Sequence, residues 1–199
     1  MVTPTPSAPS RWLDTPQRYG RISRLLHWSM ALVLLWLFVG MGLKIALGLS
    51  PRDSWIVGSH SSFGFIAWLL LLVRGTWALI NLRNRPSYGS GLVAQAARAG
   101  HVLLYLLMLA VPTLALMRQY GSGRGLQLFG SIPIIPAGDK IDWLTVPANA
   151  TRELLGLSTH GLLAWTLLAL IAGHIAMVVV HHRIWKDDTA YRMIGARLY

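Results

Sequence analysis

The sequence predicts an all-α integral membrane protein in which four helices form a bundle and both termini lie in the cytoplasm. The 199-residue chain is 54% hydrophobic and only 13% charged, which is too apolar for a soluble domain of this length. Four apolar stretches each reach the roughly 20 residues that a helix needs to cross a bilayer core. Arginine and lysine residues gather preferentially on one side of these stretches.

The expected transmembrane helices cover residues 22–47, 55–82, 94–117 and 154–182. Pro51 separates the first two helices, and a turn-rich connector at 84–91 separates the second and third. Residues 119–150 are rich in glycine and proline, and we expect a long ordered loop outside the bilayer. Residues 1–17 are expected to form a mobile N-terminal segment, which is Pro/Ser/Thr-rich at its start and is not a signal peptide. Residues 18–199 then form one transmembrane domain.

The basic residues predict the orientation of the bundle. One side is expected to carry eleven of them: Arg11, Arg18, Arg21, Arg24, Arg83, Arg85, Arg98, Arg183, Lys186, Arg192 and Arg197. The opposite side is expected to carry six: Lys44, Arg52, Arg118, Arg124, Lys140 and Arg152. The positive-inside rule places the larger group, with both termini, in the cytoplasm, and the 119–150 loop in the periplasm.

Composition argues against a nucleic-acid-binding protein and excludes sites that depend on cysteine. The net charge of +11 is accounted for by membrane topology, so we expect no nucleic-acid partner. The absence of cysteine excludes disulfides, thiolate metal sites and covalently attached c-type haem.

Histidines inside the apolar stretches are the candidate functional residues. His160 and His174 are 14 residues apart, which is nearly four helical turns, so they share a face and are separated by about 21 Å along the axis. Given the alternating direction of the helices, His27 lies at the depth of His174, and His60 lies at the depth of His160. Two imidazoles that face each other in a bundle core are what a bis-histidine haem iron requires. The sequence therefore predicts an inner and an outer haem.

Three other interpretations stay open from the residues alone. Four histidines could be buried by chance and hydrogen-bonded to backbone or serine, although intramembrane ionisable groups are usually functional. A zinc or copper site needs three or four ligands at one depth, whereas these ligands divide between two depths. A proton relay usually includes Asp or Glu, which these stretches lack.

Three further residues have candidate roles near the inner site. Arg74 lies 14 residues after His60, so it is expected at the inner level, where it pairs with a haem propionate or extends to the interface. His181 lies seven residues after His174 and is expected below the inner haem, either hydrogen-bonded to a quinone or anchoring the helix end. His101 could contact the inner haem but is not expected to be a ligand. His182 is expected to be solvated.

Several segments resemble the bacterial cytochrome b561 family. They are RYGRISRLLHW (18–28), HSSFGF (60–65), RAGHVLLY (98–105) and HHRIWKDDTAYRM (181–193). The resemblance covers nearly the whole chain, from about residue 18 to 192. Related cytochrome b subunits of hydrogenases and formate dehydrogenases have the same four-helix dihaem plan. The stretch GSGRGLQLFGSIPIIPAGDK departs most from the family pattern and leaves the donor site open.

The resemblance implies two haem b groups and electron transfer across the inner membrane to ubiquinone on the cytoplasmic side. Some members are superoxide oxidases, which pass an electron from periplasmic superoxide to ubiquinone. In that scheme the four histidines of the depth argument match the haem ligands, and His181 matches the quinone-side histidine. The alternatives are a cytochrome b subunit that relays electrons for a hydrogenase- or dehydrogenase-type partner, and a non-redox membrane protein such as a small transporter.

Overall fold

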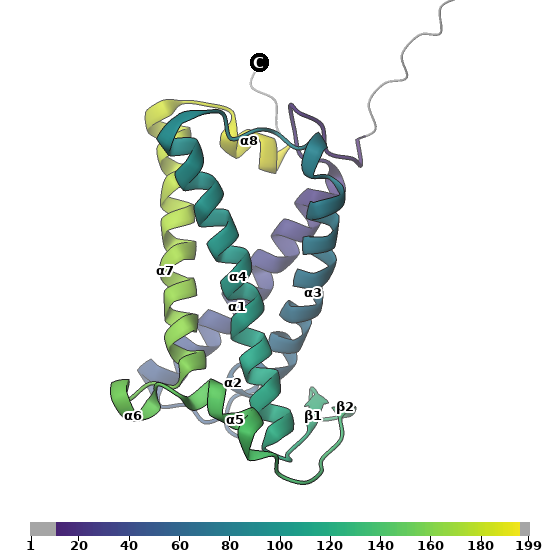
Figure 1. Ribbon diagram of the computed structural model, residues 1–199, viewed down its shortest axis with the longest axis vertical. Helices are drawn as coiled ribbons and strands as arrows, with labels where there is room; N and C mark the ends of the chain where they lie inside the picture. Colours follow the sequence, from purple (N-terminus) through teal and green to yellow (C-terminus); the bar gives the residue numbers. More distant parts are fainter. Residues whose placement is uncertain (1–10, 196–199) are drawn as a thin grey trace, which may run out of the picture.

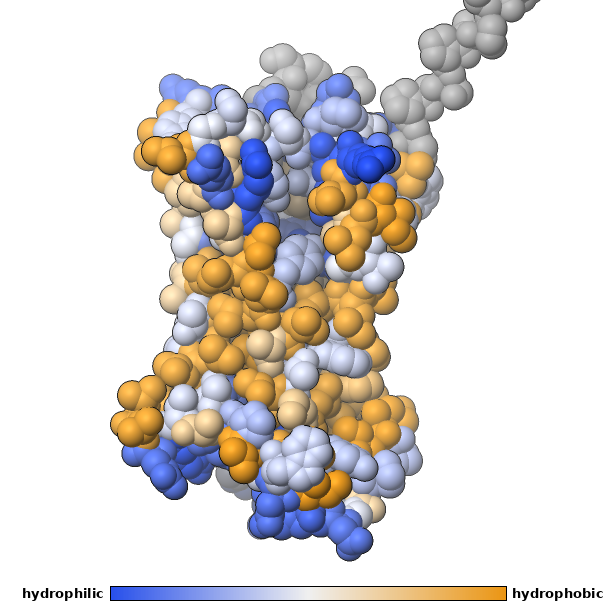
Figure 2. All heavy atoms as spheres, in the orientation of Figure 1, coloured by the Kyte–Doolittle hydropathy of each residue, from blue (hydrophilic) through white to orange (hydrophobic). Residues whose placement is uncertain are grey.

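Four long helices make up the bundle in the computed structural model, which describes residues 11–195. They are α1 (Arg21–Leu47), α3 (His60–Ile80), α4 (Gly91–Gly121) and α7 (Thr159–Val179). In sequence order each packs against the next, α1 on α3, α3 on α4 and α4 on α7 (Figure 1). Each is long and apolar enough to cross a membrane, with the last span continuing to Trp185. Figure 2 shows the apolar belt around the middle and hydrophilic residues at both ends.

Short elements cover the two ends of the bundle. One end, called here the hairpin end, carries α2 (Trp55–Gly58), strands β1 (Leu126–Leu128) and β2 (Ile132–Ile135), α5 (Asp142–Asn149) and α6 (Arg152–Leu155). The other, called the α8 end, carries the 3-10 helix η1 (Leu82–Asn84), the π-helix η2 (Val180–Trp185) and α8 (Thr189–Ile194). Arg11 and Gly195, the two ends of the described chain, both lie at the α8 end of the bundle (Figure 1).

Two of the expected helices differ from the structure because of local hydrogen bonds and a left-handed glycine. The helix expected at 55–82 is interrupted at Ser59, whose hydroxyl donates to the Ile56 carbonyl and accepts from the Trp36 indole. The helix expected from residue 154 instead begins at Thr159. Gly156 ends α6 with a left-handed φ of 68°, and the Ser158 side chain then caps α7.

The third helix and the following segment also differ from expectation. Helix α4 is longer than 94–117 at both ends, because it starts at Gly91 and continues to Gly121. The 119–150 segment is therefore not a simple loop. After α4 it forms the antiparallel β1–β2 hairpin and the helix α5, which packs on α4 and α7.

Part of the N-terminal segment expected to be mobile is tied to the bundle. Residues 1–10 lie outside the described residues. From Arg11 onward the chain is ordered around the buried carboxylate of Asp14, which accepts hydrogen bonds from the Gly20 amide, the Ser23 hydroxyl and the Arg85 guanidinium. Gly20 has no space for a side chain, because a Cβ there would collide with the Trp12 and Leu13 backbone.

The central core separates two levels of the bundle. Its buried members come from all four long helices: Met30, Ala67, Leu71, Met108 and Leu167. Leu167 lies midway between His160 and His174 on α7, so this apolar layer occupies the space between the two predicted sites.

Candidate functional site

The pair at the hairpin end is His60, the first residue of α3, and His160, near the start of α7. Their ring centroids are 6.4 Å apart and the rings are nearly perpendicular, at 89°. His160 Nδ1 lies 2.9 Å from the Val111 carbonyl oxygen. Since a carbonyl only accepts, Nδ1 carries the proton and Nε2 keeps a lone pair for a metal. His60 Nδ1 is buried and has no hydrogen-bond partner among residues 11–195.

The pair toward the α8 end is His27 on α1 and His174 on α7. Their ring centroids are also 6.4 Å apart, with the planes tilted by 58°. His101 on α4 approaches His174 edge-on at 5.3 Å. A guanidinium is always a donor, so the 3.0 Å contact between Arg74 Nη2 and His27 Nδ1 makes that nitrogen the acceptor. Arg74 also lies over the Tyr105 ring, 5.4 Å from its centroid.

Both pairs have the spacing that a bis-histidine iron requires. Two imidazole nitrogens, each about 2 Å from a metal between them, place the ring centroids about 6 Å apart, since each centroid lies about 1 Å behind its nitrogen. Both observed separations meet this value. Within residues 11–195 no group of three or more His, Cys, Asp or Glu side chains is arranged to hold a metal ion. The donor sets fit haem iron, which each pair of imidazoles would hold when the haem is bound.

The β1–β2 hairpin packs on α3 close to His60. The Phe129 amide, in the turn of the hairpin, donates to the buried hydroxyl of Ser62, which lies two residues after His60. The Phe129 ring packs against Trp55 and Phe63, at 6.4 and 5.5 Å between centroids. Positive charge adjoins this site. Lys44 and Arg118 both act electrostatically on His60.

His181 is carried by the π-helical turn η2 at the α8 end. Its Nδ1 lies 2.6 Å from Asp187 Oδ2, and its ring meets Trp185 edge-on at 4.5 Å. The other Asp187 oxygen accepts from the Thr189 amide. Partial burial would raise the pKa of Asp187, but the hydrogen bonds from His181 and Thr189 outweigh it and hold the pKa below its ordinary value. The carboxylate thus stays charged and orients the imidazole.

A sequence model of prokaryotic cytochrome b561 matches residues 18–196. The chain belongs to the prokaryotic cytochrome b561 family. It is therefore a multi-pass protein of the inner membrane that takes part in electron transfer and binds b-type haem. The resemblance in the sequence motifs is confirmed.

Three curated relatives align along almost the full length of this cytochrome b561 chain. Cytochrome b561 homolog 2 of Escherichia coli (strain K12) is 34% identical over 92% of this chain and 94% of its own length. The protein named probable superoxide oxidase CybB of Yersinia pestis is 26% identical over 89% and 96%. Cytochrome b561 homolog 1 of E. coli (strain K12) is 26% identical over 90% and 98%.

The structure brings the candidate residues of this cytochrome b561 together as two pairs and one outlying group. His27 adjoins His174, and His60 adjoins His160, which are the pairs that the depth argument predicts. Arg74 lies at the inner pair, in contact with His27. His181 lies apart from both pairs, and the α-helical arithmetic behind its expected bearing does not hold beyond Val179, where the π-helix begins. His182 is exposed and packs against Tyr191.

Sequence reasoning missed four groups that shape these sites. The Val111 carbonyl carries no sequence signal, because any residue supplies a carbonyl. Ser62 and Phe129 are 67 residues apart, so only the fold reveals their contact. Asp187 had a usable signal, since a carboxylate six residues after a candidate histidine at a helix end is within reach of its ring.

Proposed function

We propose that the chain transfers electrons across the membrane from periplasmic superoxide to ubiquinone on the cytoplasmic side. Two haem b groups, one between His60 and His160 and one between His27 and His174, supply the one-electron chemistry when bound. The observation that carries this proposal is the equal 6.4 Å separation of two histidine pairs at two levels of one bundle. Two superoxide ions then reduce one ubiquinone, which takes up two protons, and two molecules of dioxygen are released.

The orientation is supported by the basic residues. Ten of the eleven expected on one side belong to the described chain and lie on elements at the α8 end, whereas Arg197 lies outside the described residues. Contacts across this end tie its segments together, such as Arg24 to the Ile194 carbonyl and Arg85 to Asp14. Because cytoplasmic segments carry the excess of Lys and Arg, the α8 end is proposed to be cytoplasmic and the hairpin end periplasmic.

At the hairpin end, the positive charge near His60 and the packing of the hairpin favour a small anionic electron donor. Lys44 and Arg118 raise the local positive potential near His60, which favours the approach of superoxide. Lys140 contributes less, because its ammonium is paired with Asp142 at 2.6 Å on an exposed surface. The Phe129 ring and the Ser62 bond close the protein over the His60 side, which limits access by larger molecules. The name of the Y. pestis relative supports superoxide as the donor.

At the inner pair, Arg74 could donate either to His27 Nδ1 or to a haem propionate. It bonds to His27 Nδ1, and that bond places the neutral histidine's proton on Nε2, the nitrogen needed for iron. We therefore propose that Arg74 would hold a haem propionate when haem is bound, in place of its bond to His27 Nδ1. The fork of a guanidinium matches a carboxylate, and an arginine at this depth needs an anion.

At the α8 end, His181 is proposed to handle the protons of quinone reduction. Asp187 accepts from Nδ1, so the neutral imidazole presents Nε2 as an acceptor, and the protonated imidazole donates from Nε2 to a quinone oxygen. Asp187 is partly exposed and gives the ring a route to solvent protons. Asp187 is thus a positioning residue, and His181 is the group that touches the quinone.

The direct test uses the purified full chain, loaded with haem and reconstituted in liposomes. Superoxide generated outside should reduce added ubiquinone-1, and superoxide dismutase should abolish the reaction. His181→Ala should slow ubiquinol formation while keeping the haem spectrum. A haem-loaded chain that is not reduced by superoxide but co-purifies with an iron–sulfur protein would instead be a cytochrome b subunit. A colourless pure protein would exclude haem altogether.

A further inference from the structure

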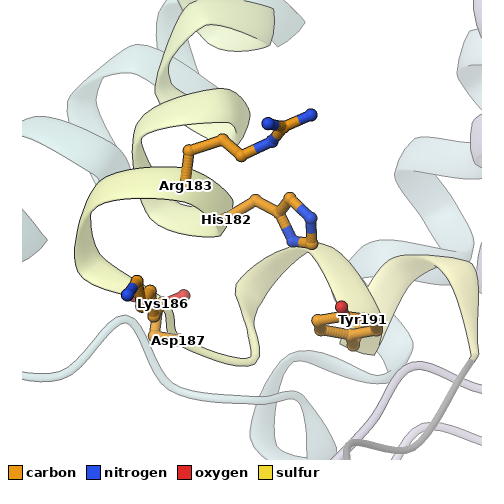
Figure 3. Close-up of a pocket in the computed structure, with 5 residues that line it drawn as sticks. All are labelled: His182, Arg183, Lys186, Asp187 and Tyr191. Carbon is orange, nitrogen blue, oxygen red and sulfur yellow. The ribbon is translucent and has the colours of Figure 1, made fainter.

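A pocket at the α8 end lies beside the π-helical turn, and of its lining residues only Asp187 has a proposed role in electron transfer. Its volume is about 290 Å³, and it is lined by His182, Arg183, Lys186, Asp187 and Tyr191 (Figure 3). In Figure 3, Arg183 and His182 project from the same side of the turn, and Tyr191 approaches from α8. The volume lies at the lower end of the range for small-molecule sites, so it holds a headgroup and not a whole lipid or a prenylated quinone.

The pocket carries a net positive charge. Within residues 11–195 neither Arg183 nor Lys186 has a hydrogen-bond or ion-pair partner. The acidic lining residue, Asp187, is already used, because its two oxygens accept from His181 Nδ1 at 2.6 Å and from the Thr189 amide at 2.9 Å. The pocket is therefore lined by two permanent cations, Arg183 and Lys186, and by the Tyr191 hydroxyl. Its carboxylate, Asp187, is already hydrogen-bonded to other groups. This donor set matches an anion with several acceptor oxygens, and a phosphate is the common example.

The position of the pocket indicates where the anion comes from. The fourth membrane span ends at Trp185, so the pocket lies at the level of the lipid headgroups. Ile184 is 69% exposed and Trp185 is 46% exposed on the same turn, which gives lipid chains an apolar surface directly beside the cations. Aromatic and basic residues at a span end are the usual partners of an anionic leaflet.

We propose that this pocket binds the phosphate of an anionic phospholipid from the leaflet at the α8 end. Arg183 and Lys186 are its cationic contacts and Tyr191 donates a hydrogen bond, while Ile184 and Trp185 pack against the acyl chains. The bound lipid bridges η2 and α8, so it holds the turn that carries His181. This proposal does not depend on the electron donor or acceptor.

The test is lipid binding to the full haem-loaded chain in a zwitterionic detergent, measured by native mass spectrometry. Phosphatidylglycerol should bind at one saturable site, and phosphatidylcholine should bind at least tenfold more weakly. Each basic residue near an anionic surface contributes roughly fivefold to lipid affinity, so Arg183→Gln with Lys186→Gln should weaken binding about 25-fold. Tyr191→Phe, which keeps the ring, should weaken it by a few-fold.

A charge-matched control separates the pocket from general surface attraction. Arg83→Gln with Arg98→Gln removes two charges from the same end of the bundle at residues that do not line the pocket, and should leave the saturable site intact. Equal weakening by the two double variants would overturn the proposal. So would equal affinity for phosphatidylcholine, or inorganic phosphate binding as tightly as phosphatidylglycerol, which would make free phosphate the ligand. Loss of the lipid on addition of ubiquinone-1 would assign the pocket to the quinone and would equally contradict it.

Discussion

Replacing Asp187 with Asn tests whether the carboxylate positions His181 for proton transfer to the quinone. The substitution keeps the shape of the side chain and can still offer a carbonyl oxygen to His181 Nδ1, but it removes the charge. A charge-assisted hydrogen bond of this kind contributes about 1.5–3 kcal/mol when shielded. The two side chains are 20% and 40% exposed, so solvent screening reduces this to roughly 1 kcal/mol.

That energy translates into a modest and specific kinetic effect. A loss of roughly 1 kcal/mol slows a step by about fivefold, whereas loss of the general acid–base group itself costs tenfold or more. Asp187→Asn should therefore slow reoxidation of the reduced haems by ubiquinone about fivefold, and His181→Ala should slow it by at least tenfold. Both variants should keep the haem spectra and the rate of haem reduction by an outer donor.

The pH dependence of the effect follows from the direction of the pKa shift. Hydrogen bonds from His181 and Thr189 hold the pKa of Asp187 below its ordinary value, so the interaction is fully present above that value and is lost only as pH falls through the lowered pKa. The carboxylate is therefore ionised throughout the range from about pH 6 to 8. Titration of Asp187 itself should therefore add no pH dependence to the parent reoxidation rate across that range.

The assay is anaerobic stopped-flow mixing of pre-reduced protein with ubiquinone-1, followed by haem absorbance. Asp188→Asn is the matched control, because this neighbouring carboxylate makes no side-chain bond to the turn. His182→Ala is a second control, since its ring faces Tyr191. Reoxidation of Asp187→Asn at the parent rate, an equal defect in Asp188→Asn, or a defect carried wholly by His182→Ala would refute the reasoning.

Four further predictions address the rest of the chain. Arg74→Leu should lower the potential of the inner haem by roughly 60 mV and leave the outer haem nearly unchanged, as seen in a redox titration, because a nearby cation favours the reduced state; equal shifts at both haems, or none, would favour an interfacial role. Ser62→Ala should raise hydrogen exchange in the 126–135 hairpin about fivefold, since one bond worth about 1 kcal/mol is lost, without a change in α5. Asp14→Ala should lower the unfolding free energy by about 3 kcal/mol in thermal melts, with Thr15→Val as the milder control, because a buried carboxylate holds Gly20, Ser23 and Arg85. Burial raises the pKa of Tyr19 and of Tyr88, so stability should fall as pH rises above about 10, and Tyr19→Phe with Tyr88→Phe should remove that fall.

The sequence predicted the features that depend on periodicity and depth. Four apolar stretches gave the four spans, and a regular 3.6-residue helix made the 14-residue interval from His160 to His174 a reliable measure of height. Matching heights then selected His27 and His60 as partners, and the structure brings their rings next to those of His174 and His160. The same arithmetic assumes a regular α-helix as far as His181, whereas the chain changes from α- to π-helix at Val180, which alters the angle per residue.

The features that the sequence did not predict depend on single contacts. The break at Ser59 arises from hydrogen bonds to Trp36 and to the Ile56 carbonyl, and the start of α7 depends on the Ser158 cap. The hairpin at 126–135 is short and its strands lack clear alternation, so periodicity gave no signal. Its docking depends on the backbone amide of Phe129, a group that every residue except proline has.

The central claim is that two haem irons lie between two histidine pairs at different depths. The most direct measurement is the pyridine haemochrome content of the fully loaded chain, compared with that of His160→Ala and His174→Ala. The account predicts two haems per parent chain and one in each variant, with redox titration assigning the lost haem to the hairpin end for His160→Ala and to the α8 end for His174→Ala. One haem or fewer in the parent, or loss of the same haem in both variants, would contradict it.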